Sequence, residues 1–179
     1  ENTLANRKIG LGVMGFADTL IRLGIPYDSE DAALIAETLM SRIQEISKEA
    51  SRKLASERGA FPNFPRSEYA KKSEAPLRNA TTTTTAPTGT ISIIAGTSSG
   101  IEPLFALAFV RNVMDNDVLV EVNPLFEEIM RREDLYSDAL MKQVARSGSV
   151  AHLDEIPKQL KRILVTAHDI APEWHIRIQ

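Results

Sequence analysis

The segment from residue 81 to residue 103, TTTTTAPTGTISIIAGTSSGIEP, restricts the fold of this chain more than any other. Threonine is β-branched and favours strands over helices, so we expect residues 80–86 to form a strand that ends at Pro87. The Pro-Thr-Gly turn then leads into residues 90–96, TISIIAG, which we expect to form a short helix.

The turn after this strand has the features of an anion site. A helix N-terminus leaves backbone N–H groups unpaired and carries partial positive charge, so phosphate binds there readily. Gly89 allows the backbone to approach a ligand closely, and the hydroxyls of Thr88, Thr90 and Ser92 suit phosphate oxygens. The alternative is a capped helix after a strand, with nothing bound.

Stop and cap signals predict the first helices. The first is expected to begin near Phe16 and to end at Gly24. A second, capped by Asp28, is expected to run to about Arg58 and to end at Gly59. It should lie on the outside of the core, because charged residues cover one face while apolar residues keep helical spacing on the other: Leu34, Ile35, Leu39, Ile43, Ile46, Ala50 and Leu54.

The second half of the chain is predicted to mix strands and helices. After a proline-containing loop at residues 59–79, the apolar run 104–113 is typical of a strand buried on both faces, followed by a turn at 114–117 and a strand at 118–122. Asn123 is a candidate cap, with Pro124 at the first helical position. Further helices are expected at about 137–146 and 157–168, and from the APEWHIRIQ segment.

Composition excludes several classes of function. A net charge of −3 over 179 residues gives no broad basic surface for nucleic acid. There is no apolar run long enough to span a membrane and no signal peptide, so we expect a cytoplasmic protein. With no cysteine, the chain has no disulfide, thiolate metal site or cysteine nucleophile. The His168–Asp169 pair is interpreted as a helix end with a capping aspartate, and no metal site is predicted.

One motif suggests a different class of protein. Gly10, Gly12 and Gly15 fit the dinucleotide fingerprint Gly-x-Gly-x-x-Gly, but the preceding ENTLANRKI is polar where the fingerprint needs a buried strand. We expect these glycines to allow close packing instead. A third hypothesis is a non-catalytic binding or scaffold domain, which predicts no phosphate affinity at the threonine-rich turn.

The block ATTTTTAPTGTISIIAGTSSGIEPLFALAFVRN resembles the C-terminal part of the catalytic barrel of ribonucleotide reductase large chains, most of all the adenosylcobalamin-dependent (class II) enzymes. RKIGLGVMGFADTLIRLG, VEVNPLFEEIMRRE and TAHDIAPEWHIRIQ resemble other segments of the same enzymes. The resemblance implies an α/β fold that is about one half of a ten-stranded barrel. Residues 1–179 would then be a fragment of the catalytic barrel domain, truncated at both ends.

The resemblance also implies a function for the parent enzyme, the reduction of ribonucleotides to 2′-deoxyribonucleotides by thiyl-radical chemistry. Backbone amides or hydroxyls of Thr88, Gly89, Thr90, Ile91 and Ser92 would hold the substrate phosphates. The family's catalytic cysteines have no counterpart here, so no catalytic residue is assigned and the fragment alone is expected to be inactive. Adenosylcobalamin and a thioredoxin-type reductant are implied for the parent enzyme, and self-association is expected for the fragment. The residues do not distinguish diphosphate from triphosphate substrates.

Overall fold

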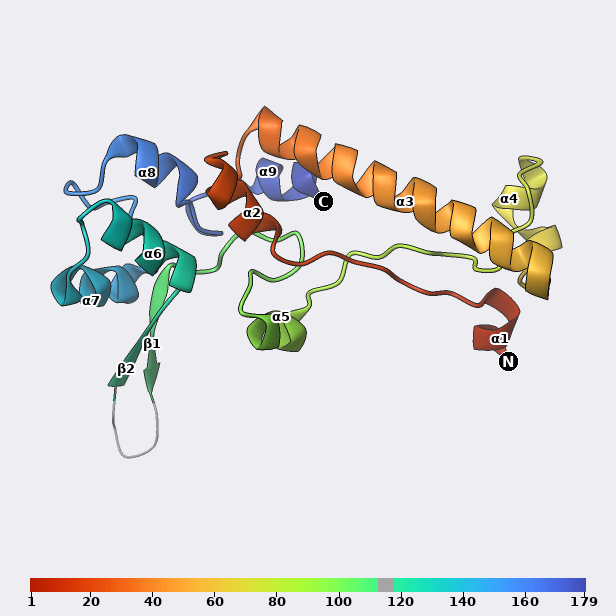
Figure 1. Ribbon diagram of the computed structural model, residues 1–179, viewed down its shortest axis with the longest axis horizontal. Coiled ribbons are helices and arrows are strands. Elements are labelled where there is room, and N and C mark those ends of the chain that lie inside the picture. The colour runs from red at the N-terminus through yellow and green to blue at the C-terminus, as the bar shows by residue number, and fades with distance from the viewer. Residues whose placement is uncertain (113–117) are drawn as a thin grey trace. The chain divides into compact units, whose positions relative to one another are not determined.

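The computed structural model describes residues 1–112 and 118–179. The chain forms two compact units. The first comprises Glu1–Val13 and Ile35–Ala86, and the second comprises Met14–Leu34 and Pro87–Gln179. Figure 1 gives the element labels. No helix among the described residues is long and apolar enough to cross a membrane.

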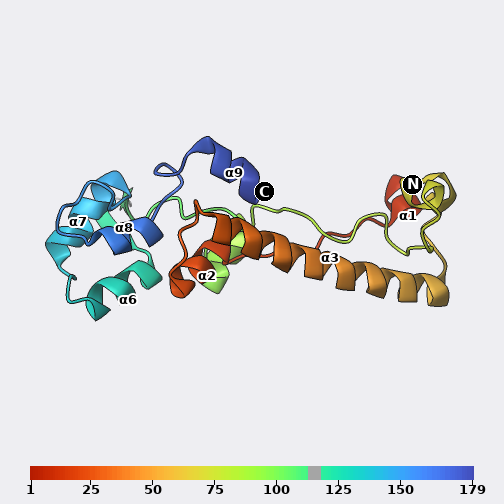
Figure 2. The ribbon, with the colours of Figure 1, turned by 90° about the horizontal axis from the view of Figure 1, so that it is seen from above.

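The first unit consists of one long helix with short helical pieces and extended chain beside it. The pieces are α1 (Asn2–Asn6), the 3-10 turn η1 (Phe64–Arg66) and α4 (Glu68–Lys71), and the long helix is α3 (Glu30–Arg58), which begins in the second unit. Thus the segment 59–79, predicted as a loop, contains two short helical turns. Figures 1 and 2 show α1 and α4 near the C-terminal end of α3.

The predicted apolar face of α3 is wrong in part. Leu34, Leu39, Ile46 and Leu54 are exposed, whereas the small residues Ser51 and Ala55 are buried. Small side chains let the extended segment after Leu77 approach the helix backbone. The carbonyl of Ser51 accepts a hydrogen bond from Arg78 N–H (3.1 Å), and its hydroxyl donates to Asn79 Oδ1 (3.0 Å). In this unit, therefore, the residues of α3 that are buried are small or hydrogen-bonded, and the most apolar ones are not buried.

The threonine run is extended, but only one β-bridge forms where a strand was predicted at residues 80–86. Leu11 and Thr83 make a parallel bridge, in which Leu11 N–H donates to Thr82 O (2.9 Å) and Thr84 N–H donates to Leu11 O (3.1 Å). The extended backbone confirms the preference of β-branched residues. Ile9 N–H also donates to Thr81 O (3.1 Å), but only the one bridge between these segments forms among the described residues.

Helices cover the base of a β-hairpin in the second unit. Strands β1 (Ala108–Asn112) and β2 (Val118–Val122) are antiparallel, with Val110 opposite Val120. Figure 1 shows the helices α6 (Pro124–Arg132) and α7 (Asp138–Ser147) beside this base, and α8 (Lys158–Ile163) belongs to the same unit. The core there is fully buried and apolar, and includes Leu107, Ala108, Phe126, Met130, Val144 and Val150.

The expected two-sided burial of the apolar run 104–113 is wrong for its central residues. The strand begins only at Ala108, and Phe109 and Val110 are 43% and 42% exposed. Figure 1 shows covering helices near the base of the hairpin, where Ala108 pairs with Val122, and Phe109 and Val110 follow Ala108 along β1. Val113 and the turn predicted at 114–117 lie outside the described residues.

Most helix ends confirm the local signals. Helix α2 (Phe16–Leu23) ends at Gly24 in the left-handed region (φ 71°), and the Asn123 side chain accepts from the N–H groups of Leu125 and Phe126 at the start of α6. The last helix, α9 (Pro172–Ile178), also forms. Helix α8 ends at Ile163, so it is shorter than the helix predicted at 157–168.

The cap predicted at Asp28 is wrong. The hydroxyl of Ser29 accepts the hydrogen bond from Ala32 N–H (3.2 Å), while the Asp28 carboxylate pairs with Arg162. Both residue types are good caps, and in the structure Ser29 caps the helix while Asp28 forms the ion pair.

Candidate functional site

The predicted anion site lies at the start of α5 (Gly89–Ala95), in the second unit. Thr88 precedes the helix in the left-handed region, with φ 51° and ψ 24°. The first intrahelical bond runs from Ser92 N–H to Thr88 O (2.8 Å). The N–H groups of Gly89, Thr90 and Ile91 therefore have no acceptor within the helix, and these three residues are exposed.

The five predicted site residues divide into two groups. Gly89, Thr90 and Ile91 face solvent, and a Cβ built on Gly89 would meet nothing within 4 Å. By contrast, Ser92 is buried and its hydroxyl donates to Gly89 O (3.0 Å), while the Thr88 hydroxyl accepts from Gly100 N–H (2.7 Å). Internal hydrogen bonds therefore occupy the hydroxyls of Ser92 and Thr88, which leaves Thr90 as the exposed hydroxyl.

Residues 97–100, which we call the clamp segment, hold this loop in place. The hydroxyls of Ser99 and Ser92 are 2.9 Å apart. The Asp18 carboxylate of α2 accepts from the Thr97 hydroxyl and from Ser98 N–H, both at 2.8 Å. In return, Asp18 N–H donates to the Ser98 hydroxyl (3.3 Å). The clamp segment thus links the start of α2 to the first turn of α5.

Neutral groups dominate the electrostatics of the loop. The stretch from residue 81 to residue 110 contains no lysine or arginine, and its only charged residue is Glu102, which is exposed. Tyr27 donates its hydroxyl proton to Ile101 O (2.7 Å). Burial raises the pKa of the Tyr27 phenol above its ordinary value, and the charge of Glu102 raises it further. A phosphate here would rely on amides and hydroxyls.

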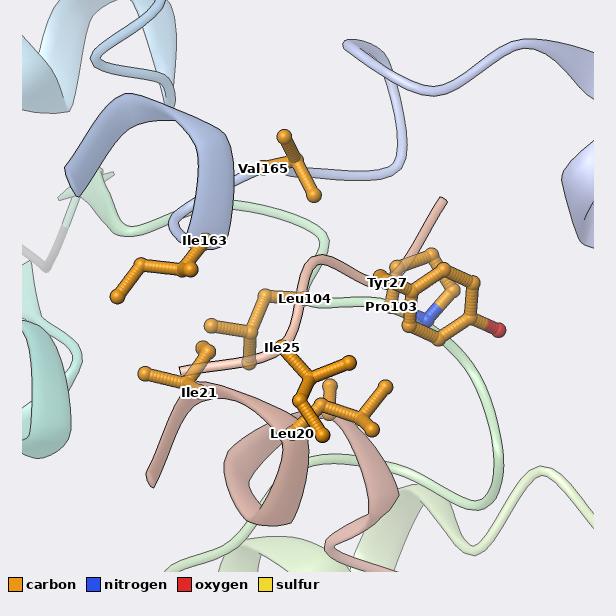
Figure 3. Close-up of a pocket in the computed structure, with 9 residues that line it drawn as sticks. Leu20, Ile21, Ile25, Tyr27, Pro103, Leu104, Ile163 and Val165 are labelled. Carbon is orange, nitrogen blue, oxygen red and sulfur yellow. The ribbon is translucent and has the colours of Figure 1, made fainter. Parts of the chain in front are cut away.

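An apolar pocket lies beside this region, between α2 and the segments around Leu104 and Ile163 (Figure 3). Leu20, Ile21 and Ile25 contribute one wall. Its volume is about 10 Å³, which is room for roughly one water molecule. The pocket is therefore a packing defect in the core and holds no substrate-sized ligand.

The remaining sequence candidates have structural roles. Asp169 accepts from Thr166 N–H (2.9 Å), the Thr166 hydroxyl (2.8 Å) and the Ser149 hydroxyl (2.7 Å), and His168 contacts the Phe105 ring edge-on. No cluster of three or more metal-binding side chains occurs in the part of the chain that the structure describes.

The glycine motif also serves packing. A Cβ on Gly12 would lie 2.9 Å from Thr84 O, and one on Gly10 would lie 2.6 Å from Thr84 Cγ2. The helix α1 precedes this motif, where a dinucleotide fingerprint requires a buried strand. Both observations agree with the close packing expected from the sequence.

Sequence reasoning missed the supporting groups of the site, above all Asp18 and Ser99. The cluster of small residues GTSSG was a visible signal, because serine and threonine next to glycine favour side chain–backbone hydrogen bonds. Nothing in the sequence pointed to Asp18, which lies 80 residues away from Ser98 along the chain.

Comparison with known proteins identifies the family. The family model described as "Ribonucleotide reductase, barrel domain" matches residues 1–75 and 73–179. A "Vitamin B12-dependent ribonucleoside-diphosphate reductase" of Thermoplasma acidophilum is 56% identical over 99% of this chain and 23% of its own length. A protein of the same name from Mycobacterium tuberculosis (strain CDC 1551 / Oshkosh) is 50% identical over all of this chain and 25% of its own length.

A solved structure agrees in fold. The Actinobacillus ureae class Id ribonucleotide reductase alpha subunit matches with a TM-score of 0.71 and 25% identity, over 91% of this chain and 28% of that one. The chain thus spans about a quarter of the length of its curated relatives. The α/β fold expected from the sequence, about half of the barrel, is confirmed. Because the family model covers the whole sequence, this chain belongs to the ribonucleotide reductase barrel-domain family.

Proposed function

We propose that this chain is a segment of the catalytic barrel of a ribonucleoside-diphosphate reductase, and that residues 87–92 bind the substrate's phosphate groups. The observation that carries the proposal is the exposed first turn of α5, where Gly89, Thr90 and Ile91 have N–H groups without an intrahelical acceptor. The names of the relatives, which specify ribonucleoside diphosphates, support the diphosphate as substrate.

Each exposed residue has a distinct part in this proposal. The amides of Gly89, Thr90 and Ile91 donate charge-assisted hydrogen bonds to phosphate oxygens, and the Thr90 hydroxyl adds another donor. The absence of a side chain at Gly89 permits close approach. Because neutral donors do the binding, the site holds the phosphate end of the substrate and orients the ribose, while it leaves the chemistry to other groups.

The reduction itself depends on groups that this chain does not supply. By resemblance to the family, it requires a thiyl-radical cysteine and two reducing cysteines, and this chain has no cysteine. These groups come from other parts of the enzyme. We expect the isolated chain to form no deoxyribonucleotide even when cobalamin and a dithiol are supplied.

Adenosylcobalamin is the cofactor that we propose for the parent enzyme, in line with the names of the relatives. The described residues do not fit it. The apolar pocket of about 10 Å³ is far too small for a corrin ring, and the open hollow of about 520 Å³ near Tyr69 is lined by a mixture of apolar residues such as Phe61 and polar residues such as Asn63. By resemblance to the family, at least part of the cobalamin site lies in other parts of the parent enzyme.

Further parts of the proposal concern partners and location. A thioredoxin-type reductant would regenerate the cysteines of the parent enzyme, which would act in the cytoplasm.

Self-association of the isolated chain is supported by the hairpin, where Phe109, Val110 and Leu119 are exposed. Sedimentation velocity of the chain and of its Phe109→Glu variant tests this, and we expect the substitution to shift the chain toward monomer.

Two variants of the full-length reductase test the phosphate site. Gly89→Val places a side chain in space that is open in the structure, so we expect an unchanged melting temperature and a raised KM for the nucleoside diphosphate. Thr90→Val removes the exposed hydroxyl. A hydrogen bond to a charged group contributes roughly 1.5–3 kcal/mol, so KM should rise about 10-fold or more. Thr38→Val, on an exposed position of α3, is the matched control.

The scaffold hypothesis predicts a different outcome. If the loop is only a helix cap, both variants leave KM at the wild-type value. An unchanged KM for Gly89→Val and Thr90→Val, in proteins that fold normally, would overturn the proposed phosphate site.

A further inference from the structure

Hydrogen bonds bring three arginines of the first unit together around the C-terminal end of α3. Arg78 donates through Nη1 to the carbonyl oxygens of Arg58 (2.7 Å) and Gly59 (3.0 Å). The next residue, Asn79, donates its side-chain amide to the carbonyl oxygen of Arg7 (2.9 Å). We call Arg7, Arg58 and Arg78 the arginine cluster.

The arginine cluster has no acidic partner within the described part of the chain. None of its members forms an ion pair among residues 1–112 and 118–179. Desolvation lowers the pKa of Arg78, and the positive charges of Arg7 and Arg58 lower it further. The first unit also has more basic than acidic residues, although the whole chain has a net charge of −3. Three cations therefore lie in one another's field without a balancing charge from this chain.

The end of α3 accounts for only part of the cluster. Cations are favoured at a helix C-terminus, which explains Arg58 in the last turn and Arg78 on the last carbonyls. Arg7 follows a helix of only five residues, α1, and its Nε is buried without a hydrogen-bond partner among the described residues. Desolvating part of a charged group costs stability unless an opposite charge compensates for it. A purely structural role leaves this cost at Arg7 unexplained.

We infer that the arginine cluster binds an oxyanion, a carboxylate or a phosphate, at the guanidinium group of Arg7. A planar guanidinium matches either group with two parallel hydrogen bonds, and a negative charge there would offset the repulsion within the cluster. The oxyanion has two possible sources, an acidic side chain of the parent enzyme outside this chain or free phosphate. The cluster belongs to the first unit and residues 87–92 to the second, so this inference is independent of the proposed substrate site.

The experiment compares melting temperatures of the full-length reductase in sodium chloride and in sodium phosphate, at one pH and one ionic strength. Arg7→Gln removes the charge of Arg7. If free phosphate is the oxyanion, phosphate should raise the melting temperature of the wild type by about 2 °C or more above that of Arg7→Gln. If a carboxylate of the enzyme is the oxyanion, Arg7→Gln should melt lower than the wild type in both salts.

Two further variants separate the charge of Arg7 from its packing. Arg52→Gln removes a charge from an exposed position of α3 and should respond to both salts as the wild type does, which corrects for phosphate bound elsewhere. Arg7→Lys keeps the charge without the planar fork, so it should recover part of the loss of Arg7→Gln.

Two results would overturn the inference. Without a bound oxyanion, removal of one charge relieves repulsion, and Arg7→Gln then melts at or above the wild-type temperature in both salts. Equal losses for Arg7→Gln and Arg7→Lys in both salts would show that Arg7 acts through packing alone. Either result would leave the proposed substrate site at residues 87–92 unaffected.

Discussion

Gly15 and Thr97 lie so close together that a Cβ built on Gly15 would be 2.5 Å from the Thr97 hydroxyl oxygen. Gly15 also has a positive φ of 78° and donates its N–H to Ser98 O. A Cβ here requires the Thr97 hydroxyl to shift, and that hydroxyl donates to the Asp18 carboxylate of α2. The close approach of this segment to the start of α2 therefore favours glycine.

Gly15→Ala should destabilise the protein through both effects. The left-handed conformation costs an L-residue about 1–2 kcal/mol, and overpacking adds roughly 1–3 kcal/mol. Gly24→Ala is the matched control, because Gly24 has a similar φ of 71° but nothing within 4 Å of a built Cβ. Urea unfolding should show a clearly larger loss for Gly15→Ala, and equal losses would contradict the close contact.

The pairing of the Gly10–Gly12 segment with Thr84 gives a second prediction. Gly12→Ala would place a Cβ 2.9 Å from the Thr84 carbonyl oxygen, and we expect a loss of about 1–3 kcal/mol that no change of the Thr84 side chain relieves. The three atoms nearest to a Cβ on Gly10 all belong to the Thr84 side chain, so Thr84→Gly should partly rescue Gly10→Ala. The measurement is a double-mutant cycle in urea. Equal rescue of both alanine variants would contradict the assigned contacts.

Capping of α3 gives a third prediction. Ser29→Ala should cost about 1 kcal/mol, because the Ser29 hydroxyl accepts the Ala32 N–H. Asp28→Ala removes an ion pair with the half-exposed Arg162 and should cost less, about 0–1 kcal/mol. Thermal unfolding of the two variants checks the order, and a larger loss for Asp28→Ala would restore Asp28 as the cap.

Tyr27 gives a prediction about alkaline pH. Its pKa is raised above the ordinary value of 10.0, chiefly by burial, so the folded protein retains a proton that the unfolded chain loses. The stabilisation that this proton binding gives is complete below about pH 10 and is lost as the pH rises further. Tyr27→Phe should remove this part of the pH dependence. Ultraviolet titration should show one of the three tyrosines ionising last, and its early ionisation would contradict the buried hydrogen bond.

The sequence by itself determined the features that depend on neighbours along the chain. Asn123 before Pro124 identified the start of α6, Gly24 identified the end of α2, and the Pro-Thr-Gly turn identified the start of α5. Each signal works through hydrogen bonds or allowed φ values within one helical turn, so it can be recognised without knowledge of the rest of the fold.

Only the tertiary structure decided which side chains form internal hydrogen bonds and which remain exposed. The hydroxyls of Thr88, Thr90 and Ser92 are equivalent in the sequence, yet two of them are occupied by the clamp segment and one is exposed. The partner of Ser98 is Asp18, 80 residues earlier, and the buried face of α3 follows the small residue Ser51 because an extended segment packs there. Such contacts join segments that are distant along the chain, and no local pattern of hydropathy or propensity specifies them.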